Sequence, residues 1–201
     1  AGSIDSFATY AAVLSDVIEL ARREFDGPCH FVGFSLGAAA GIELLTQGDA
    51  PEVCGAVLLA PLLRSSFWNA SRLWYHCSGR GEVLVRRVFA RNSSDPEYLR
   101  FVRRDPLQLT HVSRRWFRAL MRWNEALETR SPSGQAVLVV QGTSDRTVAW
   151  RRNLRELAHL FPRAVAKVLP GARHQLPNEG QALREDVLTS VVDFLAAGPG
   201  P

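Results

Sequence analysis

One stretch of twelve residues, HFVGFSLGAAAG at positions 30–41, constrains the fold more than any other part of the chain. It passes from an apolar, strand-like run into Gly33, reaches Ser35 two residues later, meets Gly37 two residues after that, and continues as small residues. A serine between two glycines ordinarily marks a loop, but a loop needs neither a strand before it nor helix formers after it. The order of strand, tight turn and helix therefore predicts that the turn raises the Ser35 hydroxyl above a sheet. We expect Gly33 and Gly37 to be required, because a side chain at either position would collide across the turn.

Further apolar runs without polar alternation predict more strands along the chain. The four predicted strands span residues 29–34, 54–60, 136–140 and 164–169. The predicted helices around them span residues 3–25, 36–46, 150–160 and 181–195. We expect Ser3 or Asp5 to cap the first helix and Asn178 to cap the last. Buried strands separated by helices are typical of a parallel sheet covered on both faces, so the sequence predicts an α/β fold.

A long interruption separates the second predicted strand from the third. It contains predicted helices at 96–104, with Asp95 as the cap, and at 113–128. Residues 61–130 hold 14 arginines against six acidic residues, and also four of the five tryptophans. By default, such tryptophans form the core of the insertion and such arginines form a solvated face. The predicted organisation is a core of residues 1–61 and 131–201 with a helical insertion at 62–130.

Two other segments carry the groups that a reactive serine needs. A serine hydroxyl becomes a nucleophile when a base takes its proton, and an acid orients that base. Asp145 and His174 each follow the carboxyl end of a predicted strand, where parallel sheets hold their sites. We therefore predict Ser35 as nucleophile, His174 as base and Asp145 as the orienting acid. The backbone N–H of Leu36, at the start of the next helix, is the predicted donor to an oxyanion.

Each of these residues also has an ordinary explanation. A single G-x-S-x-G pattern is most often a simple turn, Asp145 fits an Asx-turn, and a histidine after a strand is commonly a surface residue. The occurrence of all three in this order and context favours catalysis. The other histidines lie inside a strand, in the insertion or at the end of a helix: His30, His76, His111 and His159.

The three motifs resemble one known group of proteins. GFSLG at 33–37, GTSDRTV at 142–148 and PGARHQLPNE at 170–179 are similar to the α/β-hydrolases of the serine aminopeptidase-like group, which contains monoacylglycerol lipases and lysophospholipases. The resemblance covers residues 3–197 and is weakest in the insertion. It implies that residues 62–130 form a cap over an acyl pocket. It also implies four strands and a His-Gly-type loop before the first helix, so we expect this chain to be the C-terminal part of a longer enzyme.

The resemblance implies a serine hydrolase that cleaves carboxylic esters, such as monoacylglycerols or lysophospholipids, through an acyl-enzyme. The alternatives are an aminopeptidase or thioesterase of the same fold, or, because we expect the first strands of the fold to be absent from this chain, a non-catalytic binding domain that retains the triad. This chemistry requires no cofactor and no metal. The expected partner is a small-molecule ester or lipid. The arginines of the insertion suggest peripheral contact with an anionic membrane surface.

The sequence argues against two other kinds of protein, a membrane-spanning protein and a nucleic-acid-binding protein. No apolar run reaches the roughly 18 residues of a membrane span. Nucleic acid is not expected, because no basic stripe with interleaved stacking aromatics is present. We expect a cytoplasmic protein, with a peripheral membrane location as the alternative.

Overall fold

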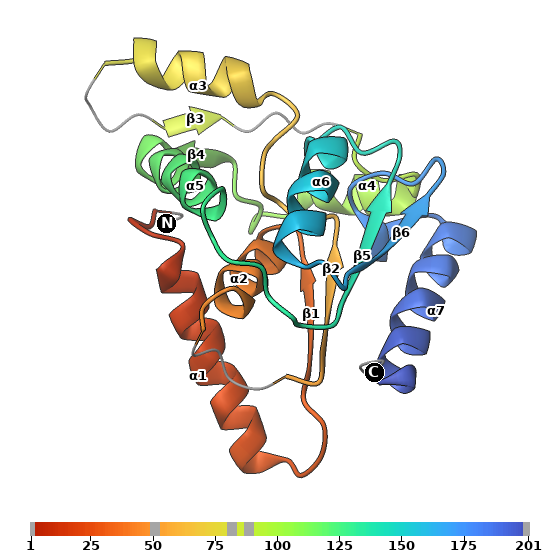
Figure 1. Ribbon diagram of the computed structural model, residues 1–201. Coiled ribbons are helices and arrows are strands. Elements are labelled where there is room, and N and C mark those ends of the chain that lie inside the picture. Colours follow the sequence, from red (N-terminus) through yellow and green to blue (C-terminus); the bar gives the residue numbers. More distant parts are fainter. Residues whose placement is uncertain (1–2, 49–52, 80–83, 87–90, 199–201) are drawn as a thin grey trace.

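The computed structural model describes residues 3–48, 53–79, 84–86 and 91–198 (Figure 1). Its central feature is a four-stranded parallel sheet in the order β1-β2-β5-β6. The strands are β1 (His30–Phe34), β2 (Gly55–Leu59), β5 (Val137–Gly142) and β6 (Val165–Leu169). Each lies within two residues of its predicted bounds, so the α/β architecture predicted from the sequence is confirmed.

The register of the sheet brings the carboxyl ends of neighbouring strands together. The paired residues at these ends are Phe34 with Leu59, Leu59 with Val140, and Gly142 with Leu169. The segments that follow β1, β5 and β6 therefore leave the sheet along the same edge. These are the segments that carry the predicted nucleophile, acid and base.

Helices cover both faces of the inner strands. The covering helices are α1 (Ala8–Glu24), α2 (Leu36–Leu45), α6 (Trp150–Leu160) and α7 (Gln181–Ala197). Val137 and Val139 of β5 belong to the hydrophobic cluster that contains residues of α1, α2 and α6. Leu138 and Val140 belong to a second cluster with Val187 of α7, which Figure 1 shows on the opposite side of the sheet from α1 and α2. The cover is incomplete at the outer strand β6, whose residues 165–168 are exposed.

The first helix begins later than the sequence predicts. α1 starts at Ala8, and Phe7 occupies the cap position without a capping side chain, so neither Ser3 nor Asp5 is the cap. Phe7 is only 1% exposed, and its ring stacks on that of Trp123 with centroids 4.4 Å apart. Tertiary packing of an aromatic side chain therefore sets this boundary, and a capping pattern could not predict it.

The cap of the last helix also differs from the prediction. Gly180 is the residue before α7, and it has no side chain with which to cap the helix. Asn178, the predicted cap, lies instead in the short 3-10 helix η1 (Leu176–Asn178). The reason is that the chain makes an extra turn after the histidine before the helix begins.

The segment between β2 and β5 contains more elements than the sequence predicts. Its elements are α3 (Trp68–Cys77), β3 (Leu84–Arg86), α4 (Pro96–Arg104), β4 (His111–Ser113) and α5 (Arg114–Leu127). The predicted α4 is confirmed, and the Asp95 side chain accepts hydrogen bonds from the N–H groups of Glu97 and Tyr98. The antiparallel pair β3–β4 is three residues long, too short to show strand periodicity. The prediction also misses α3, which begins without a capping side chain.

The tryptophans of this segment only partly form a core of their own. Trp68 packs within the segment against Phe117, with ring centroids 5.6 Å apart. In contrast, the Trp123 Nε1–H donates to the Glu43 carboxylate of α2, and the Trp116 Nε1–H donates to the Tyr10 hydroxyl of α1. The expectation of a separate aromatic core is therefore wrong for α5, which packs into the main core. Within the described ranges, no helix combines the length and apolarity needed to cross a bilayer.

Candidate active site

Ser35 lies in a strained turn between β1 and α2. Its φ of 51° and ψ of −108° fall in a region that residues other than glycine rarely adopt. Its N–H donates to the Leu59 carbonyl at 2.9 Å, and its carbonyl accepts from the Leu62 N–H at 3.1 Å. The residues at and after the end of β2 thus hold the strained backbone in place. The predicted strand, turn and helix around Ser35 are confirmed.

The two glycines of the G-x-S-x-G motif differ in what surrounds them. A Cβ on Gly33 would lie 2.6 Å from the Phe31 ring and 2.8 Å from the backbone nitrogen of Ala38. This position therefore excludes a side chain, as predicted. A Cβ on Gly37 would meet no described atom within 4 Å. The expected collision at Gly37 is wrong, because this residue lies in the first turn of α2 and faces open space.

The structure brings the three predicted side chains into one chain of hydrogen bonds. The His174 Nε2 lies 3.0 Å from the Ser35 Oγ, and the His174 Nδ1 lies 2.8 Å from an Asp145 carboxylate oxygen. Both distances are those of well-formed hydrogen bonds. His174 is 4% exposed and Asp145 is 5% exposed, so water is largely excluded from the pair.

The Asp145 carboxylate is held from several directions. Its Oδ1 accepts from the N–H groups of Thr147 at 2.7 Å and Val148 at 3.1 Å. Burial alone would raise the pKa of Asp145, but the hydrogen bond and the attraction from His174, with the two backbone donors, bring it below its usual value. An ionised carboxylate only accepts hydrogen bonds, so the Nδ1 of His174 carries the proton on that side. The Nε2 that faces Ser35 is then free to accept a proton.

Gln141 is a residue of the site that sequence reasoning missed. Its Nε2 donates to the Asp145 carboxylate at 3.1 Å and to the Gly142 carbonyl at 3.1 Å, and the residue is fully buried. Its side-chain oxygen is buried and has no hydrogen-bond partner among the described residues. The available signal was one polar residue at the end of an otherwise apolar strand, VLVVQG.

Gly142 explains how the loops that carry Asp145 and His174 meet. A Cβ on Gly142 would overlap the backbone carbonyl of Ala172. The Ser144 N–H donates to this same carbonyl at 2.9 Å. The loops after β5 and β6 can therefore approach closely only because residue 142 has no side chain.

Two further groups flank the reacting atoms. Leu36 is the first residue of α2, where a backbone N–H has no acceptor within the helix and the helix dipole is positive. This is the position predicted for an oxyanion donor. The Phe34 ring packs beside the His174 imidazole, with centroids 5.2 Å apart. In the described part of the chain, no three His, Cys, Asp or Glu side chains gather as they would around a metal ion.

Comparisons with known proteins identify the family of this chain. Residues 1–181 match the family described as serine aminopeptidase, S33. The chain belongs to this family. Among the relatives of this family member is a protein named probable lysophospholipase L2 from Haemophilus influenzae, which is 24% identical over 221 residues that cover 96% of the chain and 68% of the relative.

Solved structures show the same fold. A soluble variant of monoglyceride lipase from Saccharomyces cerevisiae, in complex with a substrate analogue, superposes with a TM-score of 0.77 at 17% identity over 97% of this chain and 70% of that one. Monoacylglycerol lipase from Paleococcus ferrophilus gives a TM-score of 0.76 at 20% identity over 98% of this chain and 77% of that one. The predicted α/β-hydrolase fold and the resemblance to this group are confirmed. Family and relatives together support an ester-hydrolysing enzyme.

Proposed function

We propose that this family member hydrolyses carboxylic esters through a covalent acyl-enzyme, with Ser35 as the nucleophile, His174 as the base and Asp145 as the acid that orients the base. The observation that carries the proposal is the unbroken set of hydrogen bonds from Asp145 through His174 to Ser35. Strained backbone costs about 1–3 kcal/mol and persists where the surrounding structure enforces it. The enforced strain at Ser35 favours a reactive serine over a binding domain that merely retains these residues.

The proposed reaction has two steps. The His174 Nε2 takes the proton of the Ser35 hydroxyl while the Oγ attacks the ester carbonyl carbon, and the N–H of Leu36 donates to the oxyanion that forms. The tetrahedral intermediate collapses, the bond to the alcohol breaks, and the proton on His174 passes to the leaving oxygen. Water then attacks the acyl-enzyme after giving a proton to His174, which returns it to Ser35 as the acid product leaves.

The proposed substrates are monoacylglycerols or lysophospholipids. Support comes from the relatives, one named as a lysophospholipase and two as monoglyceride or monoacylglycerol lipases. We further propose that residues 1–61 and 131–201 act as the catalytic core and that residues 62–130 act as a cap over the acyl chain.

An aminopeptidase would instead need an acidic group for the free amine of its substrate. Several carboxylates of the segment already have other partners. Asp95 caps α4, Asp105 accepts from the Leu107 N–H, and Glu128 pairs with Arg64 at 2.7 Å. These carboxylates are thus already engaged by other groups, which favours an ester over a peptide as the substrate.

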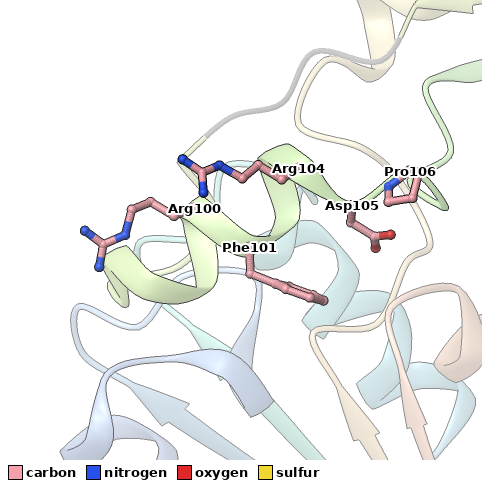
Figure 2. Close-up of a pocket in the computed structure, with 5 residues that line it drawn as sticks. All are labelled: Arg100, Phe101, Arg104, Asp105 and Pro106. Carbon is pink, nitrogen blue, oxygen red and sulfur yellow. The ribbon is translucent and has the colours of Figure 1, made fainter.

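A second part of the proposal concerns the membrane. A cavity of about 410 Å³ lies along the second half of α4 and the two residues after it, and is lined by Arg100, Phe101, Arg104, Asp105 and Pro106. Figure 2 shows the Arg100 and Arg104 side chains extending together from the helix, with the Phe101 ring on another side. Phe101 is 65% exposed, and no residue of α4 is buried. Cations beside an exposed aromatic ring suit an anionic lipid surface. The cytoplasmic location expected from the sequence stays a prediction.

The test of the proposed function uses Ser35→Ala, with Ser131→Ala, an exposed serine outside the site, as the matched control. We expect the parent chain and the control to hydrolyse p-nitrophenyl butyrate and to be labelled by a fluorophosphonate. Ser35→Ala should lose the label and about 10⁴-fold or more in kcat. Labelling that persists in Ser35→Ala would refute the proposal. Comparison of monooleoylglycerol, a lysophospholipid and an amino-acid anilide then ranks the substrate classes.

A further inference from the structure

Glu179 is a fully buried carboxylate that the proposed reaction does not use. It is 0% exposed, and its side chain accepts three hydrogen bonds from residues that the structure describes. One oxygen accepts from the Arg173 N–H at 2.6 Å. The other accepts from the Ser94 N–H at 2.7 Å and from the Ser94 hydroxyl. Burial of a carboxylate costs free energy of solvation, which its hydrogen bonds must offset. The structure around a buried carboxylate therefore depends on those hydrogen bonds.

These hydrogen bonds lie directly beside His174. Arg173, whose N–H donates to Glu179, is the residue before it. Gln175, the residue after it, donates its N–H to the Asn92 carbonyl at 2.9 Å. The backbone on each side of the imidazole is therefore fixed by a contact that involves Glu179 or the segment 92–94.

Residues 92–94 and 173–180 are joined by further contacts, and we refer to the two segments together as the latch. The Ser93 hydroxyl donates to the Asn178 carbonyl at 2.6 Å, and the Gly180 N–H donates to the Ser94 hydroxyl at 2.9 Å. Ser93 is fully buried. The latch thus joins two segments about 85 residues apart in the sequence.

The latch connects the proposed base to the proposed cap. Ser94 immediately precedes Asp95, the N-cap of α4, so α4 begins where the latch ends. Figure 1 shows α4 near the carboxyl ends of β5 and β6. A displacement of α4 would therefore pull on the backbone that carries His174. Misplacing a catalytic group by 1 Å can cost about 100-fold in rate.

We propose that Glu179 is a positioning residue that holds His174 in line with Ser35 and Asp145 and couples this alignment to the docking of α4. The inference rests on the function proposed above. Glu179 does not contact the reacting atoms in this scheme. It acts through the Arg173 N–H on one side and through Ser94 on the other.

Glu43 offers a matched control. It is also buried, at 5% exposure, and it also joins the core to the segment between β2 and β5. Its carboxylate accepts from the Trp123 Nε1–H at 2.8 Å and from Arg130 at 2.6 Å. These partners are distant in sequence from His174. Loss of either glutamate should lower stability, but only loss of Glu179 should disturb the imidazole.

The experiment compares Glu179→Gln with Glu43→Gln in the full chain, well below the Tm of each variant. Glutamine keeps the shape but turns one acceptor oxygen into a donor that faces another donor. We expect Glu179→Gln to lose on the order of 10–100-fold in kcat with little change in KM. We expect Glu43→Gln to show a lower Tm and a kcat like that of the parent.

A second readout does not depend on turnover. The proton shared by His174 and Asp145 gives an NMR resonance, which we expect to shift or broaden in Glu179→Gln and to stay unchanged in Glu43→Gln. If Glu179→Gln does not fold, Ser94→Ala replaces it in both measurements. Ser94→Ala removes one hydrogen-bond donor to Glu179, so we expect the same changes in kcat and in the resonance, but smaller. A Glu179→Gln protein that matches Glu43→Gln in kcat and in this resonance overturns the inference. Turnover that persists in Ser35→Ala would refute the proposed function alone, because the resonance still tests the alignment.

Discussion

The two carboxylate oxygens of Asp145 accept hydrogen bonds from different parts of the site. Oδ1 binds the backbone N–H groups of Thr147 and Val148, as in an Asx-turn. Oδ2 binds the His174 imidazole and the Gln141 amide. The contacts of Asp145 thus fit both the ordinary explanation and the proposed catalytic one, because one oxygen shapes the turn and the other faces His174.

The first prediction concerns the proton on His174. In Asp145→Asn the side chain can present an N–H toward Nδ1, which moves the ring proton to Nε2 and leaves Ser35 without a base. We expect kcat to fall about 10³–10⁴-fold while KM changes little. Steady-state kinetics with p-nitrophenyl butyrate measures both constants. Asp26→Asn, at an exposed position, is the control and should retain parent activity. Parent-like kcat in Asp145→Asn would contradict the assignment of this acid.

The second prediction concerns stability and pH. The pKa of Asp145 is lower in the folded chain than its usual value, so folding favours the ionised form. Its contribution is fully present above the usual Asp pKa of about 4 and is lost as the pH falls through the lower folded-state pKa. The parent should thus be more stable than Asp145→Asn at neutral pH, and the difference should shrink below about pH 4. Urea unfolding from pH 7 to pH 3 measures this difference, and a gap that widens on acidification would contradict the prediction.

At the scale of elements, the turn between β1 and α2 gives a third prediction. Gly33→Ala places a Cβ within 2.8 Å of the Ala38 backbone, which cannot move without shifting α2, whereas Gly37→Ala meets nothing within 4 Å. We expect Gly33→Ala to lose about 3 kcal/mol or more in the free energy of unfolding, and also its fluorophosphonate labelling. Gly37→Ala should unfold within about 1 kcal/mol of the parent and label normally. If the two variants had the same free energy of unfolding and the same labelling, the distances given for Gly33 and Gly37 would be contradicted.

The fourth prediction belongs to α4. Reversing the charges of Arg100 and Arg104 should weaken binding to vesicles that contain phosphatidylglycerol, because each arginine near such a surface contributes about 1 kcal/mol. Binding of the parent should also weaken with added salt. Reversing Arg151 and Arg155, which are exposed on α6, serves as the control. Vesicle co-sedimentation measures the binding. Salt-independent binding would remove the electrostatic part of the membrane proposal.

The sequence predicts elements well where one physical rule dominates. α4 matches its predicted bounds because Asp95 and Pro96 mark its start without ambiguity. The start of α1 was wrong because burial of Phe7 against Trp123 outweighs capping. The pair β3–β4 was missed because three residues carry too little pattern. Local signals therefore decide these elements only when no distant contact competes.

At the scale of the whole molecule, the order of residues along the chain predicted the site better than any local pattern. Ser35, Asp145 and His174 could be grouped in advance because parallel strands end at one edge of the sheet. Gln141 and Glu179 could not, since their partners come from the folded arrangement of loops. Gly142 is an intermediate case. The motif that begins with it could be identified in the sequence, but its close contact with the Ala172 backbone could not be predicted.

The segment between β2 and β5 joins the rest of the molecule through more than its two ends. Trp123 of α5 binds Glu43 of α2, and Ser94 before α4 binds Glu179 after the histidine. If the whole segment moved as a cap, at least one of these contacts would break. A movement that keeps both contacts is confined to the residues between Ser94 and Trp123. The proposed cap is therefore tied both to α2, the helix that follows Ser35, and to the loop that carries His174.

The hydroxyl and the imidazole that meet at this site are separated by 139 positions in the sequence. During synthesis on the ribosome, Ser35 would emerge long before its base, and it would stay chemically inert until the later segment has emerged and docked. In the proposed mechanism, reactivity toward a fluorophosphonate would thus mark the completion of folding. Under the proposed function, the growing polypeptide would therefore carry no active hydrolase until His174 has reached Ser35.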